Sequence, residues 1–473
     1  MSKYPYRQDR DEIKALLQQF DNLKAGKSNS FIEEDSFERI VDYYDDKEQL
    51  NLALEAAEYG IEQYPYSAML LLKKADLLIA LRHYKEALYI LEQAELLDNR
   101  DTNLFILKTD AYLALDMQQK AAEVLEAAIH DFEDEERLDL LFELADVYDD
   151  YENFEKVFDC LKMILEQEPN NEEALYKICF WTDFTGRNEE GIKLHQKIID
   201  EYPFNELAWF NLGAAYQGLK LYEKAIDAYE YAIAIDEKFD FALRNMGDAY
   251  IRLRRYKEAV EVLERVLVLA RPEDVIYEAI GHCYDKMANF AQARFNYKKA
   301  SHLNSEDTQL NYKIACTYMN EGNWNSAIKN LEIAMRLHRM QPEYNLAMGQ
   351  CYMELDKLDD AITYFGNVVR VRPKNMNGWL ELLKCLYKAD MLEEGLEYAG
   401  FAYEQTEGKP IFLFYKSIFL FALGKSKEAL LFLESGMTRN PKLIKKFIEI
   451  NPSILQAQPV VDLIARYKKR NSI

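Results

Sequence analysis

The hydrophobic and polar positions of this chain follow a pattern that recurs every 34 residues. The stretch from Glu206 to Phe239 is a clear copy, with two runs of apolar residues at helical spacing and a short polar turn between them. The same spacing holds in both directions, apart from two extra residues at 136–137. The copies begin at Glu34, Ala68, Thr102, Leu138, Glu172, Glu206, Asp240, Asp274, Thr308, Pro342, Met376 and Pro410. The pattern predicts twelve helical hairpins over residues 34–443 and an all-α chain.

Small and large residues keep fixed places within the copies, which supports this register. Position 20 carries Ala or Gly in eleven of the twelve copies, and position 11 carries Tyr in eight. Position 8 is glycine in four copies, at Gly213, Gly247, Gly281 and Gly349. Two helices approach closely only where a side chain is absent or is a methyl group, and large residues must then fill the surrounding space. A continuous coiled coil is disfavoured, because a heptad seam would not break at Gly and Pro once in every copy.

The copy from Glu206 resembles the tetratricopeptide repeat (TPR) consensus. The matching residues occupy positions 4, 7, 8, 11, 20, 24 and 27, and they are Trp209, Leu212, Gly213, Tyr216, Ala225, Tyr229 and Ala232. The resemblance implies a right-handed superhelical solenoid of about twelve helix-turn-helix units, with the first helix of each unit on the concave face. Members of the family bind extended peptides or helices there.

The two ends of the chain depart from the repeat. Ile13, Leu16, Leu17 and Phe20 predict an amphipathic helix over about 9–25, which a break at 26–30 ends. Two short helices with a Lys/Arg-rich outer face are expected at 443–450 and 459–469. Terminal units of a solenoid expose a face that inner units bury, so we interpret both ends as caps. The expected organisation is therefore a capping segment at 1–33, the repeats at 34–443 and capping helices at 444–473.

Charge is distributed unevenly along the chain. The net charge is −24, and residues 1–171 hold 18 Lys and Arg against 40 Asp and Glu, a net of −22. Such a field repels nucleic acid and anionic membranes. Solubility is the ordinary explanation for it, and recognition of a basic partner by the first third is the alternative. The opening residues lack a signal-peptide core, no apolar run is long enough to span a membrane, and the six cysteines form no CxxC pair. A cytoplasmic protein is expected.

Motifs that would indicate catalysis or a cofactor are weak. The two Gly-Lys-Ser tripeptides, at 26–28 and 424–426, lack the glycine that a phosphate-binding loop needs five residues earlier. His282 and Cys316 both fall at position 9 of successive units, but two ligands make a poor metal site. The units abut with almost no insertion, so no loop is long enough to form a catalytic pocket. We expect no enzyme activity, no cofactor and no metal.

The TPR resemblance also points to candidate partner-binding residues, because family members use positions 2, 5, 6, 9, 12 and 13 of each unit. In the units from Glu34 and Leu138 most of these positions are acidic, as at Asp35, Glu38, Asp42, Asp45, Asp46, Asp139, Glu143, Asp146, Asp149 and Asp150. In the middle of the array they are aromatic or amide-bearing. The candidate partner-binding residues are Tyr176, Phe180, Phe184, Phe210, Asn211, Phe241, Arg244, Asn245 and Tyr312. Exposed aromatic residues are typical binding anchors, although packing between neighbouring units could instead bury them.

The resemblance allows one family function to be tested residue by residue. Cochaperone TPR domains hold acidic C-terminal tails with a carboxylate clamp of Lys, Asn and Arg residues. Around Asn211 the required basic positions are occupied by Tyr176 and Phe241, so the clamp is absent. The sequence therefore favours a protein-interaction scaffold or adaptor that binds partner segments in its groove. An architectural subunit that self-associates, or that spaces the components of a larger assembly, is the alternative.

Overall fold

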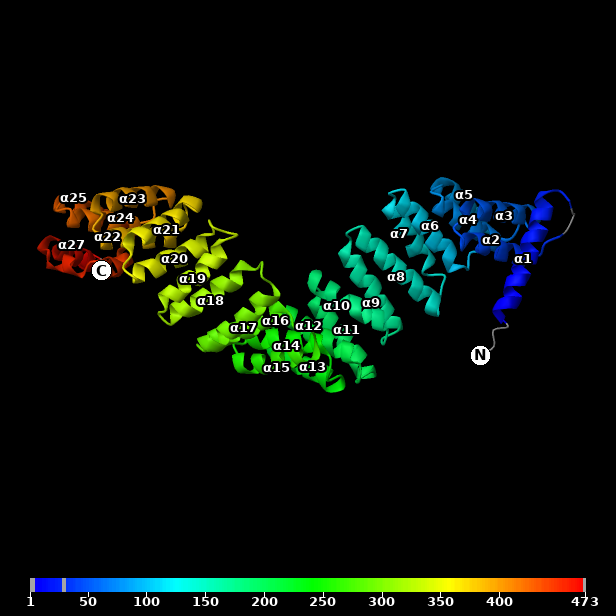
Figure 1. Cartoon of the computed structure of the whole chain (residues 1–473), viewed down its shortest axis with the longest axis horizontal. Helices are drawn as coiled ribbons and strands as arrows, with labels where there is room; N and C mark the ends of the chain where they lie inside the picture. The colour runs from blue at the N-terminus through cyan, green and yellow to red at the C-terminus, as the bar shows by residue number, and fades with distance from the viewer. Residues whose placement is uncertain (1–4, 28–30, 471–473) are drawn as a thin grey trace. The chain divides into compact units, whose positions relative to one another are not determined.

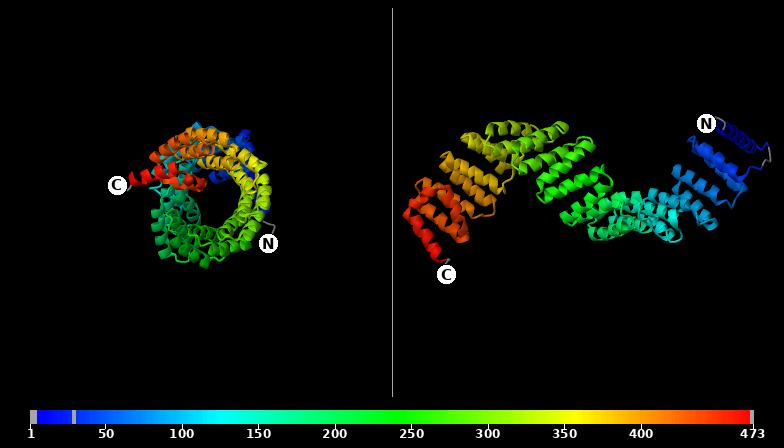
Figure 2. Two further views of the ribbon diagram at one scale, coloured as in Figure 1. Left: turned by 90° about the vertical axis from the view of Figure 1, so that its left-hand side faces the viewer. Right: turned by 90° about the horizontal axis from the view of Figure 1, so that it is seen from below.

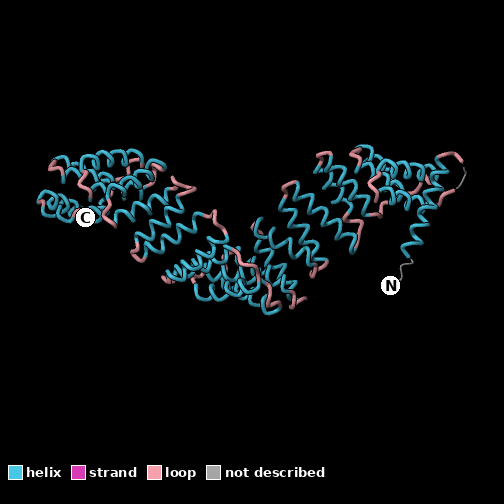
Figure 3. Tube along the Cα trace, in the orientation of Figure 1, coloured by secondary structure: helices cyan, strands magenta, loops and turns pink. Residues whose placement is uncertain are grey.

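The computed structural model describes residues 5–27 and 31–470, with side chains described for 12–27, 31–452 and 454–467. Ser28, in the first Gly-Lys-Ser tripeptide, and part of the expected break at 26–30 lie outside this range. The described residues are helical throughout, with short turns and no strand (Figure 3). The chain divides into two compact units, Met1–Ala242 and Leu243–Ile473, and the division falls inside α14.

The first unit contains thirteen complete helices among its described residues (Figure 1). They are α1 Pro5–Lys24, α2 Glu34–Asp45, α3 Leu50–Gln63, α4 Ala68–Ala80, α5 Tyr84–Leu97, α6 Thr102–Ala114, α7 Gln118–Ala128, α8 Asp134–Asp150, α9 Phe154–Gln167, α10 Glu172–Phe184, α11 Asn188–Glu201, α12 Glu206–Gly218 and α13 Tyr222–Ile235.

Helix α14, Asp240–Arg252, contains the division, and the rest of the chain forms the second unit. Its α-helices are α15 Tyr256–Leu269, α16 Asp274–Lys286, α17 Phe290–Leu303, α18 Thr308–Asn320, α19 Trp324–Met335, α20 Pro342–Glu354, α21 Leu358–Val371, α22 Met376–Lys388, α23 Leu392–Gln405, α24 Ile411–Ala422, α25 Ser426–Arg439, α26 Ile444–Ile450 and α27 Gln458–Arg470. Short 3₁₀ helices at Pro441–Leu443 and Pro452–Gln456 flank α26.

The expected all-α repeat is confirmed helix by helix. Twelve helix pairs run from α2–α3 to α24–α25, and ten of the twelve expected starts coincide with the start of a helix. Helix α8 begins four residues before its expected start, at Asp134, and α24 begins one residue later than expected, at Ile411. Helices lie side by side with their neighbours in the chain within each unit (Figure 2).

The turn inside each pair repeats in its backbone as well. Position 15 has a positive φ in all twelve repeats, at Glu48, Arg82, Asp116, Glu152, Gly186, Lys220, Arg254, Ala288, Gly322, Asp356, Asp390 and Gly424. Gly424 has a φ of +75°, so the second Gly-Lys-Ser tripeptide forms a helix-ending turn. Nine of these residues are not glycine, which explains why this regularity was not visible as a glycine pattern.

In most pairs, a small residue at position 8 packs opposite a larger one at position 24. A Cβ atom added to Gly213 would lie 2.5 Å from Cε1 of the buried Tyr229. The pairs Gly281 with Tyr297 and Gly349 with Phe365 repeat this contact. Where position 8 is Ala, position 24 is a buried Leu, as in Ala75 with Leu91, Ala145 with Leu161 and Ala315 with Leu331. The two positions therefore share one volume, as close packing requires.

Side-chain hydrogen bonds mark the start of many first helices. Asn205 caps α12 by accepting a hydrogen bond from the backbone N–H of Ala208 at 2.7 Å. The indole N–H of Trp209 donates to the carbonyl of Pro203 at 2.9 Å, and Trp379 does the same with Pro373 at 2.7 Å. The consensus Trp at position 4 thus binds the proline that ends the preceding helix.

Candidate functional site

The first helices of successive repeats form a continuous surface in the first unit. Helix α4 contacts α2 and α6, α6 contacts α8, and α10 contacts α12. Lys177 on α10 extends the row by pairing with Asp146 on α8 at 3.5 Å. We call the surface formed by α2, α4, α6, α8, α10 and α12 the first-helix surface.

Three of the expected aromatic residues project from this surface as one stripe along α10. Tyr176, Phe180 and Phe184 are each four residues apart, which places them on the same helix face. Their side chains are exposed, at 61%, 60% and 57%. The rings of Phe180 and Phe184 are stacked, with centroids 5.7 Å apart. The structure therefore shows these three rings exposed and not buried between repeats.

Two further aromatic residues, which the sequence pattern did not single out, complete this group. Trp181 stacks on Phe154 of α9, with ring centroids 5.3 Å apart, and it meets Phe180 edge-on, with centroids 4.9 Å apart. Phe154 also meets Phe184 edge-on at 4.9 Å. We call Phe154, Phe180, Trp181 and Phe184 the aromatic cluster. Phe154 and Trp181 occupy positions 17 and 10 of successive repeats, so only contact between repeats reveals that they belong together.

The next expected residues on the first unit are more deeply placed. Phe210 on α12 is half-buried. Its ring centroid lies 5.8 Å from that of Tyr229 and 5.1 Å from that of Phe239. Phe241 is exposed and meets Phe239 edge-on at 6.4 Å. Asn211 is buried, and its amide donates to the carbonyl of Leu175 at 2.7 Å. The Asn211 side chain therefore joins α12 to α10.

The remaining three expected residues lie in the second unit. Arg244 forms a two-point ion pair with Glu273, at 2.7 and 2.9 Å, which lowers the pKa of that carboxyl. Tyr312 is half-buried against the ring of Tyr344 at 5.1 Å, and burial raises the pKa of its hydroxyl. Asn245 is half-buried. The structure brings none of these three into the exposed stripe of α10.

Carboxylates cover the other end of the first-helix surface, as the acidic positions of two repeats suggested. The structure adds Asp76 on α4 and Asp110 on α6, which occupy position 9 of the intervening repeats. Burial raises the pKa of Asp76, Asp110 and Glu143, and neighbouring carboxylates raise each further. The acidic positions therefore form one crowded surface.

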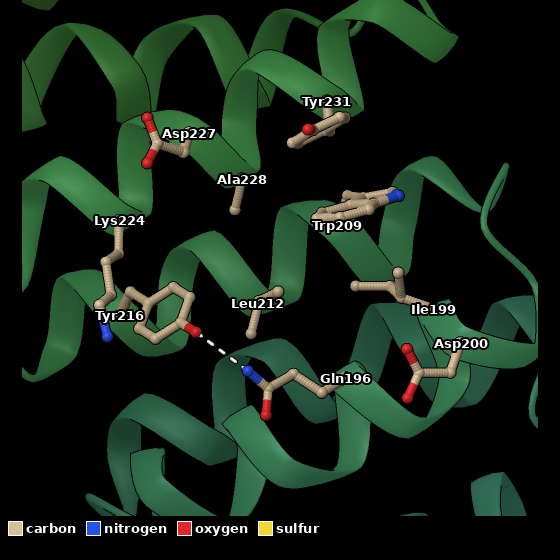
Figure 4. A pocket seen from close by; sticks show the side chains of 10 residues that line it. All are labelled: Gln196, Ile199, Asp200, Trp209, Leu212, Tyr216, Lys224, Asp227, Ala228 and Tyr231. Atoms are coloured by element: carbon tan, nitrogen blue, oxygen red, sulfur yellow. Dashed lines mark hydrogen bonds between the residues drawn. The ribbon is translucent and has the colours of Figure 1, made fainter.

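A pocket of about 410 Å³ lies between α11, α12 and α13 (Figure 4). One wall is the stack of Trp209 on Tyr231, with centroids 4.4 Å apart, and Gln196 donates to the Tyr216 hydroxyl at 3.1 Å. Hollows of about 470 and 250 Å³ occur at the corresponding positions around α7–α9 and α19–α21. Because the hollow recurs, we attribute it to the way successive pairs stack.

Metal-binding groups and membrane-spanning helices are both missing from residues 5–27 and 31–470. Within them no three His, Cys, Asp or Glu side chains converge in a way that could hold a metal ion. In the same range no helix is both long enough and apolar enough to cross a bilayer. All six cysteines are free, and four of them, Cys160, Cys283, Cys351 and Cys385, are buried.

Family models match the middle of the chain. Residues 184–238 and 342–375 match models of the tetratricopeptide repeat, and residues 215–350 match the C-terminal ARM domain of tetratricopeptide repeat protein 21. No curated protein matches the sequence.

Several solved structures resemble parts of the chain. The C-terminal part of a TPR repeat-containing protein from Cytophaga hutchinsonii is 15% identical, with 54% of this chain and 99% of that chain covered and a TM-score of 0.45. YrrB, described as a TPR protein with an unusual peptide-binding site, is 19% identical, with 39% and 95% covered and a TM-score of 0.35. The APC/C hetero-tetramer Cut9–Hcn1 is 12% identical, with 85% and 97% covered and a TM-score of 0.35.

Sequence period, helix pairs and family models agree with one another. The 34-residue register holds from α2 to α25, and the matched models fall within it. The chain is a tetratricopeptide-repeat protein with a helical solenoid fold.

Proposed function

We propose that the chain is a protein-interaction scaffold that binds a partner segment through Tyr176, Phe180 and Phe184 on the first-helix surface and through Phe241 on α14. TPR folds generally mediate protein–protein interactions, and this general role follows from the family. The exposure of these four rings, all between 57% and 61%, carries the finer proposal. Leaving large apolar side chains in water is unfavourable, and such rings become anchors when a partner covers them.

In this proposal, the buried neighbours position the anchors. Asn211 fixes α12 against α10, and Phe210 supports Phe241 through Phe239. Arg244 and Tyr312 lie outside the proposed surface, because the ion pair with Glu273 and the contact with Tyr344 already involve their side chains. We also propose that α1 and α26–α27 act as caps, and that the protein is cytoplasmic and non-catalytic. Six free cysteines and a net charge of −24 agree with a reducing compartment and with partners other than nucleic acid.

A photo-cross-linking experiment tests the proposal. A photoreactive phenylalanine is placed at Phe180 or Phe241, and in matched controls at Phe204 or Tyr66, rings that are 82% exposed in turns after second helices. We expect one protein to be captured from the first pair of sites and not from the control sites. Its purified form should then bind the wild-type chain, and Phe180→Ala should weaken that binding by about 2 kcal/mol.

The other outcomes separate the alternatives. Equal capture at all four sites would contradict a specific binding surface formed by the exposed rings of α10 and α14. Capture of a second copy of this chain would support the architectural role, in which the solenoid self-associates. Light scattering of the purified protein would then show a concentration-dependent mass.

A further inference from the structure

The aromatic cluster has exposed rings on the first-helix surface, and its rings carry no cation supplied by the described part of the chain. Several other rings are covered by the protein's own Lys or Arg, with Arg187 at 4.2 Å from the Phe158 centroid and Lys156 at 4.6 Å from that of Tyr148. Among the residues that the structure describes, no Lys or Arg lies over Phe180, Trp181 or Phe184 in this way. Phe180 and Phe184 stack on each other but remain 60% and 57% exposed, so the parts of the rings outside the stack are accessible to a cation from outside.

Acidic residues neighbour the aromatic cluster in the chain. Asp183 directly precedes Phe184, and the exposed Asp149, Asp150 and Glu152 lie just before Phe154, whose ring contacts both Trp181 and Phe184. A ring face beside carboxylates favours a positively charged group over a neutral or negative one.

A row of carboxylates lies on the other helices of the first-helix surface. It comprises Glu143 on α8, Asp110 on α6, Asp76 on α4 and Asp45 on α2. Each is close enough to raise the pKa of the next along the row, from Asp45 to Asp76, Asp110 and Glu143. None of the four belongs to an ion pair within the described part of the chain. The lysines nearby are already paired, Lys73 with Asp42 and Lys108 with Glu95, both at 2.5 Å.

We propose that the partner of this surface is a basic segment, with an arginine packed on the exposed part of the Phe180 and Phe184 rings and further Lys or Arg residues paired with Glu143, Asp110 and Asp76. This inference rests on the proposed function and adds the chemical class of the partner. Arginine fits the aromatic faces better than lysine, because its guanidinium group is planar and more weakly hydrated than an ammonium group. The carboxylate row then orients the segment across α8, α6 and α4, and the cost of holding these like charges together falls when it binds.

The test uses the full chain and a fluorescent synthetic peptide of arginine, leucine and serine, with lysine and glutamate versions of the same peptide. Fluorescence anisotropy gives the affinities at low and at physiological salt. We expect the order arginine, lysine, glutamate, and binding that weakens as salt rises. Asp76→Asn/Asp110→Asn/Glu143→Gln should weaken binding of the arginine peptide by about tenfold.

A matched variant controls for total charge. Glu62→Gln/Glu92→Gln/Glu230→Gln removes three charges from exposed residues of second helices, and it should change the affinity less than about twofold. A second variant, Phe180→Leu, keeps an apolar side chain but removes the ring face. It should reduce the preference for arginine over lysine by about fivefold.

Several outcomes would overturn the inference. One is that the two triple variants weaken binding of the arginine peptide equally, and another is that the glutamate peptide binds as tightly as the arginine peptide. An unchanged preference for arginine over lysine in Phe180→Leu, or no binding of the arginine peptide at low salt, would also overturn it. A scaffold that still captures a partner by cross-linking at Phe180 would survive each of these results. The two proposals can therefore fail separately.

Discussion

Two aromatic residues in adjacent repeats show how differently the same type of side chain is used. Tyr229 lies in the interior of the α12–α13 pair, fully buried against Gly213. Phe180 lies on α10 and is 60% exposed. The first occupies position 24, where a large residue fills the gap left by a missing side chain. The second occupies position 9, where the repeat requires no particular residue.

This contrast indicates which substitutions should destabilise the folded protein. In the interior, a change at position 24 is felt at position 8, because the two positions share one volume. On the first-helix surface, a change removes contacts with solvent and with a few neighbouring rings. Interior changes should therefore affect the free energy of unfolding, and surface changes should affect binding.

The largest expected effect is at Gly213 and Tyr229. Gly213→Ala forces a Cβ atom against the Tyr229 ring and should destabilise the protein by about 2–3 kcal/mol. Tyr229→Leu leaves a cavity and should cost a similar amount. The double variant creates the Ala–Leu combination that three other repeats already use, so it should recover about 1–2 kcal/mol.

Urea denaturation followed by circular dichroism measures these differences. The double variant Gly213→Ala/Tyr229→Leu is compared with the sum of the two single changes. Gly366→Ala is a suitable control, because a Cβ atom there meets nothing within 4 Å. Strict additivity of the two single effects would show that positions 8 and 24 do not share a volume.

A smaller effect, dependent on pH, is expected at His195. This side chain occupies position 24 of the preceding repeat and is fully buried, and neither ring nitrogen has a hydrogen-bond partner within the described range. Burial lowers the pKa of His195 to about 3. The unfolded chain, with an ordinary pKa near 6.5, binds a proton more readily. Stability due to this group is therefore present above about pH 6.5 and is lost as pH falls towards 3.

His195→Leu should remove that dependence. Between pH 7 and pH 5 the wild-type protein should lose about 2 kcal/mol more than the variant in the free energy of unfolding. Urea denaturation at the two pH values measures the difference. Parallel losses in the two proteins would indicate that His195 accepts a proton without leaving its buried position.

The smallest effect is expected on the carboxylate row. Burial and the neighbouring Asp76 raise the pKa of Asp110, so the folded state disfavours its charged form. The stability contribution of this group falls as pH rises through the raised pKa. Asp110→Asn should therefore stabilise the free protein at neutral pH, by no more than about 0.5 kcal/mol because solvent screens a half-exposed group. Thermal unfolding at low salt would detect the gain, and a loss of stability would contradict crowding along the row.

The repeat could be predicted from the order of the amino acids alone. A 34-residue period with small residues at positions 8 and 20 is enough to locate the helix pairs, because close helix contacts tolerate few side chains. The early start of α8, at Asp134, was not predicted. Acidic residues favour the first turn of a helix, and here Asp134, Glu135 and Glu136 extend α8 through the two inserted residues. The aromatic stripe was also accessible from sequence, because residues four apart share a helix face.

Which of the candidate residues are available to a partner depends on packing between repeats, and the three-dimensional structure is needed to see it. Asn211 and Phe180 both occupy positions that the family uses for binding, yet Asn211 is buried and bonded to Leu175 while Phe180 is exposed. Contacts between repeats likewise joined Phe154 to Trp181, residues that are 27 positions apart in the chain and belong to different pairs. The exposure of a side chain depends on which residues of the neighbouring repeat pack against it. The periodic pattern within one repeat does not specify those contacts.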